Sequence, residues 1–238
     1  MRKLAIIAAV TAFCTVASAL PMPTLPAGDL DMKYEGFSWE TDALGGHPPA
    51  GGPGVAGNVL FAVGQILKIL DAPGVTTLYD PADFGAEMTF HLHDMVSQGA
   101  APYGPTSWRT EYVGGAFDIY FDAPANYQPD TGPGSYSGVT DGLLWMSASA
   151  VSFTTVFNSA TQVGFFSGTF QVTGGAAAAL FPGGLVTIGA QTSLAVPAGW
   201  TYDHRVKGDM RGKAVPEPGS LILLTSALVG VACLRRAR

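Results

Sequence analysis

The middle of the chain is dominated by short segments in which hydrophobic and polar residues alternate, a pattern typical of half-buried β-strands. Residues 33–41 alternate around Phe37 and Trp39, with Gly36 as a predicted bulge. Residues 59–69 are apolar at both parities, which by periodicity alone also fits a helix. The glycines at 57, 64 and 74 favour one or two buried strands there. The same criteria predict further strands at residues 87–94, 108–113, 116–122, 153–158, 164–173, 185–188 and 200–206.

The turns between these segments indicate antiparallel pairing. The dipeptide Gly114-Gly115 separates the strands at 108–113 and 116–122, which is a two-residue hairpin signal. The segments at 153–158 and 164–173 form a second predicted hairpin. Nine or ten short strands with almost no helix predict a mainly β fold. We expect an antiparallel β-sandwich, with a jelly-roll-like wrap as one form of it.

Composition and charge narrow the class of protein. The chain contains 31 Gly and 17 Pro, and only 13% of its residues are charged. This excludes a disordered chain and a helical bundle and is typical of a turn-rich β domain. The central body keeps 7 Lys and Arg against 17 Asp and Glu, a net charge of about −10. A body this acidic is expected to repel nucleic acid, which we exclude as a partner.

The first 19 residues have the three parts of a signal peptide. Arg2 and Lys3 form a basic start, residues 4–16 are almost entirely apolar, and Ala17-Ser18-Ala19 supplies the small residues that a signal peptidase accepts. Ala17 and Ala19 are therefore the predicted cleavage signal. A linker at residues 20–31 and the β-sandwich body at residues 32–210 follow. The two cysteines, Cys14 and Cys233, lie outside this body, which leaves it without a disulfide.

The C-terminal segment predicts one short membrane span. Residues 211–218 form a second linker, residues 219–234 a single transmembrane helix, and residues 235–238 a basic cytoplasmic tail. The basic stop consists of Arg235, Arg236 and Arg238. At 1.5 Å per residue the apolar run only approaches the ~30 Å thickness of a bilayer core, so it would be a marginal permanent anchor.

The residues before this run carry a resemblance to a known family. A proline-flanked acid, an apolar segment and an arginine cluster follow one another at the extreme C-terminus, and together they resemble a PEP-CTERM sorting signal. The residues of the motif are Val215, Pro216, Glu217 and Pro218.

The resemblance implies that an exosortase recognises and cuts the chain near the motif. The precursor would lie transiently in the inner membrane of a Gram-negative bacterium, and the product would reach the cell surface or extracellular matrix. It further implies an association with exopolysaccharide, biofilm or floc formation. The alternative is a permanently anchored single-pass envelope protein that is never cut.

Several side chains in the body are candidates for metal binding. His91 and His93 share one predicted strand face with Glu87 and Thr89, and such a set can bind zinc when further ligands join it. An exposed strand face is the interpretation we favour. A second group of side chains offers oxygen ligands of the kind that calcium prefers. These residues lack the regular spacing of a dedicated calcium loop, so we favour an ordinary polar surface loop. That group consists of Asp118, Asp122, Asn126, Asp130 and Asp141.

Aromatic residues are the candidates for contact with sugars. Tyr103, Tyr127 and Tyr136 lie in predicted loops rich in Gly and Pro, where exposed rings could stack against polysaccharide. For most of the four tryptophans we expect burial in the core; these are Trp39, Trp108, Trp145 and Trp200.

The sequence shows no local motif of hydrolytic catalysis. It holds no G-x-S-x-G and no H-E-x-x-H motif. The pattern Gly52-x-Gly54-x-x-Gly57 matches a dinucleotide fingerprint, but it follows no strand and opens no helix. We therefore expect no enzymatic activity, no cofactor and no metal. The alternative is an exported polysaccharide hydrolase, in which two carboxylates about 5 to 9 Å apart would meet in the fold.

Overall fold

The computed structural model describes residues 23, 25–42, 44–46, 53–71, 74–128, 132 and 138–215. This part of the chain is mainly β, as predicted, and its helices are the single turns α1 (Pro81–Phe84) and η1 (Ala178–Leu180). The strands are β1 (Gly28–Thr41), β2 (Val59–Asp71), β3 (Thr77–Tyr79), β4 (Glu87–Gly104), β5 (Ser107–Val113), β6 (Ala116–Asp122), β7 (Leu143–Asn158), β8 (Val163–Gly174), β9 (Leu185–Ser193) and β10 (His204–Ala214). The ambiguous segment at 59–69 is thus a strand.

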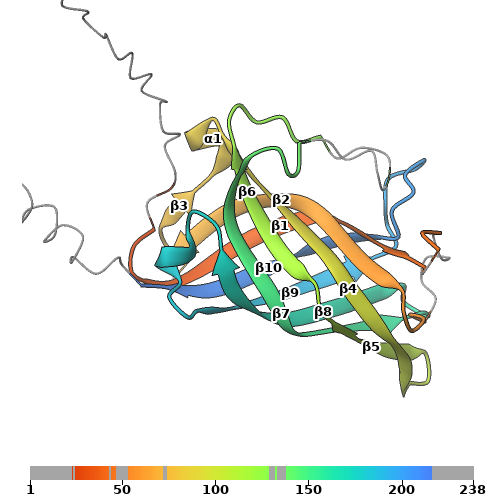
Figure 1. The fold of residues 1–238 in the computed structure, drawn as a ribbon. Helices are drawn as coiled ribbons and strands as arrows, with labels where there is room; N and C mark the ends of the chain where they lie inside the picture. Colours follow the sequence, from red (N-terminus) through yellow and green to blue (C-terminus); the bar gives the residue numbers. More distant parts are fainter. Residues whose placement is uncertain are drawn as a thin grey trace, which may run out of the picture.

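All ten strands belong to one antiparallel sheet that closes on itself. Their order is β3-β2-β1-β10-β9-β8-β7-β5-β4-β6, and a further pairing of β2 with β4 joins the two sides of the sheet. Figure 1 shows the strands curving around a common interior. The expected two-layered sandwich is therefore refined, because the layers that face each other across the core are parts of the same sheet. Most neighbours in the sheet are also neighbours in the chain, which is a simple up-and-down path.

The predicted hairpin at Gly114-Gly115 is wrong, although both of its strands exist. β5 and β6 do not pair with each other, since both pair with β4 on one side and with β7 on the other. β5 and β6 instead lie end to end between β4 and β7, and the two glycines separate them. Gly114 and Gly115 have φ angles of 69° and 78°, and Asp94 opposite them on β4 has a φ of 58°. The positive angles therefore bend a continuous line of chain instead of reversing it.

The predicted bulge at Gly36 is also displaced. The register of β1 against β2 shifts between Lys33 and Tyr34, whereas Gly36 is paired regularly with Gly64. A side chain on Gly36 would collide with the backbone carbonyl of Val63, and one on Gly64 would collide with that of Glu35. The two glycines therefore allow a close approach of neighbouring strands, which is the other common role of glycine in a sheet.

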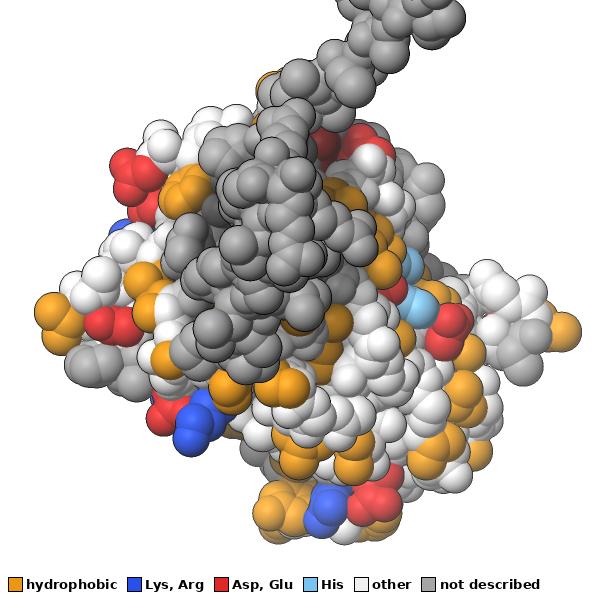
Figure 2. Space-filling model, turned by 60° about the vertical axis from the view of Figure 1, so that its left-hand side comes forward, with side chains coloured by type: hydrophobic (Ala, Val, Ile, Leu, Met, Phe, Trp, Pro, Cys, Tyr) orange, Lys and Arg blue, Asp and Glu red, His pale blue; other side chains and the backbone are white. Residues whose placement is uncertain are grey.

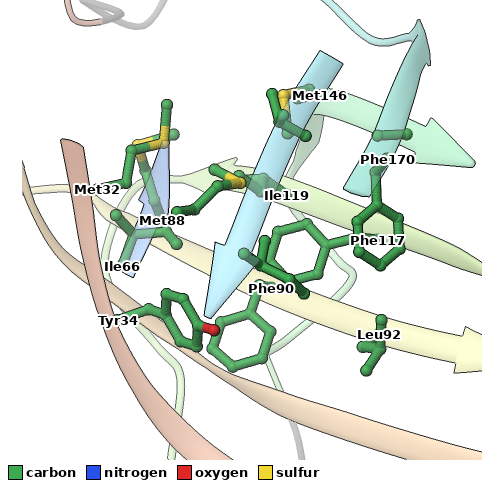
Figure 3. Packing of buried hydrophobic residues seen from close by; sticks show 14 of the residues in the cluster. Met32, Tyr34, Ile66, Met88, Phe90, Leu92, Phe117, Ile119, Met146 and Phe170 are labelled. Atoms are coloured by element: carbon green, nitrogen blue, oxygen red, sulfur yellow. The ribbon is translucent and has the colours of Figure 1, made fainter. Parts of the chain in front are cut away.

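The interior of the closed sheet is a continuous hydrophobic core (Figure 3). Phe90 of β4 and Phe117 of β6 stack with ring centroids 5.5 Å apart, and Tyr34 meets Phe90 edge to face at 5.2 Å. Trp145 of β7 lies in the same core against Phe181. Burial of this many aromatic and aliphatic side chains supplies the main driving force for folding in a body without disulfides.

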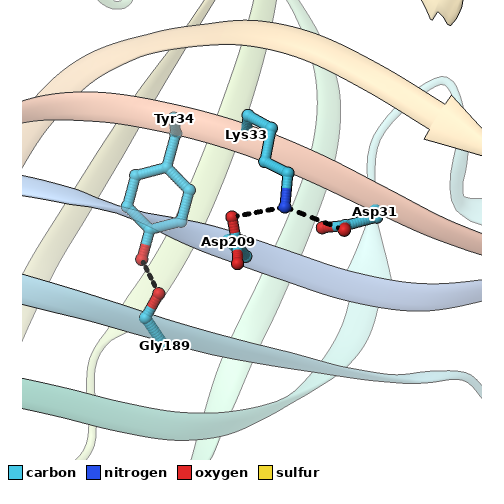
Figure 4. Close-up of polar contacts among 5 residues, drawn as sticks. All are labelled: Asp31, Lys33, Tyr34, Gly189 and Asp209. Atoms are coloured by element: carbon cyan, nitrogen blue, oxygen red, sulfur yellow. Dashed lines mark hydrogen bonds and ion pairs between the residues drawn. The ribbon is translucent and has the colours of Figure 1, made fainter. Parts of the chain in front are cut away.

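β1 and β10 close the sheet between the beginning and the end of the described chain. Their register runs from Gly28 opposite Ala214 to Ser38 opposite His204. The Lys33 ammonium donates to Asp31 at 2.9 Å and to Asp209 of β10 at 2.8 Å (Figure 4), and these contacts raise its pKa above the usual value. The sheet begins before the expected body of residues 32–210 and extends past it, so β10 takes in part of the expected linker.

The two open ends of the closed sheet differ in what their strands place inside. At the end where β1 begins and β10 finishes, inward side chains such as Leu30, Met32 and Phe181 are buried and apolar. We call this the apolar end, and Figure 1 shows α1 and both termini of the described chain beside it. At the opposite end, where β1 finishes and β10 begins, the inward side chains are mostly polar. We call this the polar end.

A second hydrophobic cluster lies on the outer surface of β1 and β2. It consists of Phe37, Trp39, Val63, Val139 and Tyr202, with Tyr127 and Trp200 packed against it. Loops from residues 125–128 and 138–141 and from residues 194–203 contribute to this cover. Within the described residues, no helix is long and apolar enough to cross a membrane; the predicted span at 219–234 lies outside them.

Candidate functional site

A small pocket at the polar end is the candidate functional site. Its volume is about 60 Å³, and it opens where the interior of the closed sheet would otherwise continue as core. Strands from all around the sheet contribute polar side chains to it: Ser38, Glu40, Thr110, Tyr112, Thr155, Thr192 and His204. Trp108 and Phe157 supply its aromatic walls. Small-molecule sites also combine aromatic walls with a few polar groups, although they usually have volumes of roughly 300–1,000 Å³.

Glu40 is held firmly in this polar-end pocket. Its Oε1 accepts a 2.6 Å hydrogen bond from the Tyr112 hydroxyl, and its Oε2 accepts one of 3.1 Å from the Asn58 amide. The backbone N–H of Glu40 donates to Oδ2 of Asp203 at 2.8 Å. Burial, reinforced by the neighbouring Glu40 charge, raises the pKa of Tyr112 well above its ordinary value, so its hydroxyl stays a donor. The two carboxylates are thus fixed at the pocket by loop and strand together.

His204 contributes an uncharged ring to the same pocket. Phe157 packs edge to face against it, with ring centroids 5.4 Å apart. Burial lowers the pKa of His204 to about 4, because the imidazolium would lose its hydration there. Its Nε2 is buried and has no hydrogen-bond partner among the residues that the structure describes. A buried ring nitrogen of this kind is a hydrogen-bonding position that a bound ligand can fill.

Sequence reasoning missed this pocket, although the signal was present. Glu40, Thr110, Thr192 and His204 all occupy the strand parity whose other positions carry core residues, such as Tyr34 in β1 and Val206 in β10. A polar residue at an inward parity position means either a buried network or a solvated opening. The sequence could not say that these positions, from strands far apart in the chain, meet at one end.

The predicted pair His91 and His93 lies on the outer face of β4, with the rings stacked at 4.7 Å. His93 makes contacts of 2.7 Å with Asp94 and 3.2 Å with Asp118, and these carboxylates raise its pKa to about 9. Burial, with the charge of His93 nearby, lowers the pKa of His91 to about 4. Figure 2 shows histidine beside acidic side chains at the surface. Across the described part of the chain, no group of three His, Cys, Asp or Glu side chains is arranged to hold a metal ion.

Glu87 and Thr89, the other two residues of that predicted strand face, hold a loop in place. The Glu87 carboxylate accepts hydrogen bonds of 2.6 Å from the backbone N–H groups of Asn126 and Tyr127, and Thr89 donates to the carbonyl of Val139. Both side chains are buried, although they point away from the core. They fasten the long loop after β6 onto the outer surface of the sheet.

The candidate calcium ligands are only partly brought together. The side-chain amide of Asn126 donates to Asp122 at 3.1 Å and to Asp141 at 3.0 Å, so these three residues form one cluster. Asp118 lies elsewhere along β6, with His93, and Asp130 lies outside the described residues. The amide of Asn126 therefore links the carboxylates of Asp122 and Asp141.

The predicted aromatic platform is not assembled from the residues that can be placed. Tyr103 is exposed near the β4–β5 turn, while Tyr127 packs against the outer cluster near the start of β4, at the opposite end of that strand. Tyr136 lies outside the described residues. Of the tryptophans, Trp145 is in the core, Trp39 and Trp200 belong to the outer cluster, and Trp108 lines the polar-end pocket.

Most of the predicted sorting and processing residues lie outside the described part of the chain. These are Ala17, Ala19, Pro216, Glu217, Pro218, Arg235, Arg236 and Arg238. Val215 is described, and its backbone N–H donates to the carbonyl of Leu180 at 2.8 Å. The first residue of the motif is therefore attached to the apolar end of the sheet.

Comparison with known protein families decides the nature of this terminus. Residues 214–237 match the family model of the PEP-CTERM protein-sorting motif. The chain carries a PEP-CTERM sorting motif. The resemblance stated from the sequence is thereby confirmed, and the motif implies an exported protein that an exosortase sorts at a membrane. The comparison with curated proteins finds no match to the chain.

Proposed function

We propose that this protein is a non-enzymatic component of the bacterial cell surface or extracellular matrix, delivered there through its PEP-CTERM signal. In this proposal signal peptidase removes residues 1–19, and the precursor lies transiently in the inner membrane. An exosortase then cuts near Pro216-Glu217-Pro218, and the released body associates with exopolysaccharide in a biofilm or floc. The observation that carries the proposal is the sorting motif at residues 214–237.

The placement of the body relative to the motif supports such processing. β10 ends at Ala214, so cleavage near Pro216-Glu217-Pro218 would leave every strand of the described residues intact. Because Gly28 pairs with Ala214, the body is closed next to the point where the motif begins. A closed body can therefore be released without losing any of its core.

A non-enzymatic role is supported by how the carboxylates at the pocket are used. Both oxygens of Glu40 accept hydrogen bonds from neighbouring side chains, and Asp203 accepts one from the backbone of Glu40. Groups engaged in this way position loops and strands, whereas a general acid or nucleophile must face a reacting bond. The pairing of two carboxylates at one pocket is the observation that favours the hydrolase alternative. Release of reducing ends from the host's exopolysaccharide by the purified protein would establish that alternative.

Sorting is tested with Glu217→Ala in a host that contains the exosortase. The substitution leaves the apolar run and the arginines unchanged, so membrane insertion should be retained while recognition of the motif is lost. Mass spectrometry of wild type should find a product without Met1 and without Arg238 at the surface or in the medium. The variant should stay in the inner membrane with Arg238 present.

Glu111→Ala is the matched control, because Glu111 is an exposed acid on β5, far from the motif in the sequence. It should be processed like wild type. A wild-type protein that keeps Arg238 in the membrane of this host would contradict the proposal. The tail would then be a permanent anchor.

A further inference from the structure

The outer face of β8, β9 and β10 carries a hollow that lies apart from the polar-end pocket. Its volume is about 490 Å³, which is within the usual range of binding sites. Val206 and Met210 of β10 are buried in the core, so the alternate residues of this strand point outward. The side chains that border the hollow are Phe165, Thr187, Gln191, Lys207, Asp209 and Arg211. We call this hollow the outer groove.

Gly189 forms the floor of the outer groove, in the middle of β9. It pairs regularly with Ser167 of β8 and Asp209 of β10, and its φ angle is not positive, so neither a bulge nor a turn requires glycine here. A side chain at Gly189 would meet no atom nearer than the carbonyl oxygen of Phe166 at 3.9 Å, so no neighbouring strand requires it either. An interior glycine weakens a strand, and the close approach of a ligand is a common reason for one.

Two cations border the outer groove without forming an ion pair among the described residues. The acids of the body outnumber its bases by 17 to 7, so a free cation is unusual here. The bases that form ion pairs in the described part of the chain are Lys33, Lys68, Arg109 and Arg205. Lys207 and Arg211 are not among them. Asp209 lies between these two cations, and Lys33 holds its carboxylate at 2.8 Å (Figure 4).

We propose that the outer groove binds a short stretch of an acidic glycan, a polymer of sugar rings that carry carboxylate groups. This inference rests on the proposed function, because it names the surface that would contact exopolysaccharide and the charge of that polymer.

The positions of the two cations fit a polymer better than a single sugar. Lys207 and Arg211 are four residues apart on one strand face, which is about 13 Å. A polymer carries carboxylates at intervals along its length, so it can reach both cations at once. The guanidinium of Arg211 can bind a carboxylate through two parallel hydrogen bonds, whereas the Lys207 ammonium acts as a point charge. Elsewhere the acidic body repels such a polymer, which directs it to this face.

The other residues of the outer groove fit the rings and their hydroxyls. Phe165 is 59% exposed, and its ring offers an apolar surface on which the C–H face of a sugar can pack. Thr187 and Gln191 both donate and accept hydrogen bonds, as sugar hydroxyls do. Gly189 leaves room for a ring to approach the backbone between them. A hollow with an exposed ring at its border suits a strand of polymer rather than the flat surface of a membrane.

The outer groove continues along β10 towards the apolar end. A second hollow of about 440 Å³ shares Thr187 and Arg211 with the first and extends to Lys213, which also forms no ion pair among the described residues. Asp29 and Asp31 of β1 border its far side. The free cations of both hollows therefore lie on β10, and a polymer can run along this strand past Arg211.

The test measures binding of trigalacturonate and of its fully methyl-esterified form to the full chain by titration calorimetry. The protein is purified in a non-ionic detergent, and the buffer at pH 7 contains EDTA. The two probes share their rings and hydroxyls and differ in whether the carboxyl groups are charged. We expect saturable binding of the acid in the millimolar range or tighter, and binding of the ester that is weaker by about tenfold or more. Binding of the acid should also weaken with added salt.

Three variants locate the site. Arg211→Gln should weaken binding of the acid by about tenfold or more, because it removes a charged, bidentate donor. Arg109→Gln removes one cation from the outer face of β5 and should leave binding unchanged. Gly189→Val fills the floor of the outer groove and should also weaken binding by about tenfold or more. Valine favours strands and finds open space there, so the midpoint of urea denaturation should not fall.

The wild-type measurement decides the inference even if a variant does not fold. Equal affinity for the acid and the ester, or no saturation by the acid up to about 20 mM, would overturn it. Equal weakening by Arg109→Gln and Arg211→Gln would do the same, because the attraction would then come from overall charge. A folded Gly189→Val that binds like wild type would contradict the placement in the outer groove.

Vesicles test the other occupant of a basic surface. Tighter binding to vesicles that contain phosphatidylglycerol than to vesicles of phosphatidylcholine, without binding of trigalacturonate, would assign the outer groove to a membrane surface and overturn the inference. Processing is measured separately in the host. A protein that is processed but does not bind contradicts this inference alone, and one that binds but is not processed contradicts the proposed function alone.

Discussion

The apolar and polar ends are built from the same strands, yet the apolar end is a filled core and the polar end is an opening lined by polar side chains. Along β1, the inward positions change from Leu30, Met32 and Tyr34 to Ser38 and Glu40 within one uninterrupted strand. At the apolar end, aromatic and aliphatic side chains fill the interior and exclude water. At the polar end, hydroxyls, a carboxylate and an imidazole surround an opening. One strand can therefore contribute both to the core and to the pocket, because each of its inward-facing positions can carry either an apolar or a polar residue.

The difference also separates stability from function along the length of the sheet. Burial of large apolar side chains contributes far more free energy than a pocket of mixed polarity can. The polar end can keep its unfilled volume and its neutral histidine because the rest of the interior holds the sheet together. Substitutions at matched positions of the two ends test this division.

The largest effect is expected in the core. Phe117 is 1% exposed and stacks on Phe90, so Phe117→Ala should lower the free energy of unfolding by about 3–5 kcal/mol. Urea denaturation of the full chain measures it. Phe165→Ala is the control, because Phe165 is 59% exposed on β8, and its loss should be less than about 1 kcal/mol. Similar losses in the two variants would contradict the assignment of this cluster as the stabilising core.

At the polar end the Tyr112–Glu40 hydrogen bond gives the next largest effect. Tyr112→Phe removes the donor at 2.6 Å and leaves Oε1 of Glu40 without it, at a cost of about 1–3 kcal/mol. The same denaturation experiment applies. Tyr103→Phe, which changes an exposed tyrosine near the β4–β5 turn, should stay within about 0.5 kcal/mol of wild type. An unchanged midpoint for Tyr112→Phe would mean that water replaces the donor freely.

The histidines predict opposite slopes of stability with pH. The pKa of His204 is lowered to about 4 in the folded state, so the unfolded chain binds its proton first, and stability falls as pH drops from about 6.5 to about 4. The pKa of His93 is raised to about 9, so its contribution is complete below about pH 6.5 and disappears as pH rises through about 9.

Two variants show which histidine causes each change of stability with pH. His204→Gln should reduce in part the loss of stability at acid pH, since His91 contributes there too. His93→Gln should reduce the loss of stability at alkaline pH. NMR titration of the imidazole signals provides the direct measurement. A ring of His204 that titrates near pH 6.5 would show that the polar end is fully hydrated.

The smallest effect is expected for charges on the outside of the same end. Arg109 and Glu111 form an ion pair at 2.9 Å on β5, with side chains that are 46% and 64% exposed. Glu111→Gln should change the free energy of unfolding by no more than about 0.5 kcal/mol, because water screens such pairs. A loss above about 1 kcal/mol in urea denaturation would show that the outer face contributes to the stability of the polar end.

Local patterns predicted the strands well, and long-range contacts explain what they missed. Alternation located β1 and the first half of β4, because one face of each strand must be apolar, whereas glycines indicated a strand at β2. Only residues 153–158 of β7 were predicted, and β3 was missed. Gly114-Gly115 was misinterpreted because positive φ angles serve both a reversal and a bend, and only the partners of a strand distinguish the two. The outer cluster was missed for the same reason, since the covering loops come from distant parts of the chain.

The sorting motif and the polar-end pocket show the two limits of prediction for function. The motif is contiguous, so its order of residues was sufficient to identify it. The pocket unites Glu40, Tyr112 and His204 from three strands, and their meeting depends on a closure that no local pattern contains. Among the described zinc and calcium candidates, His93 contacts Asp118, and Asn126 bonds Asp122 and Asp141, which are contacts that the sequence alone did not predict.

The pairing of β1 with β10 has a consequence for the timing of synthesis. Lys33 and Asp209 are 176 residues apart, so at 5–20 residues per second the first strand waits roughly 10–35 s for its partner. During that interval one edge of β1 is open, and open edges invite association with other chains. The sorting motif is made directly after β10. A chain that stops before β10 therefore lacks both the closing strand and the sorting motif that an exosortase would recognise.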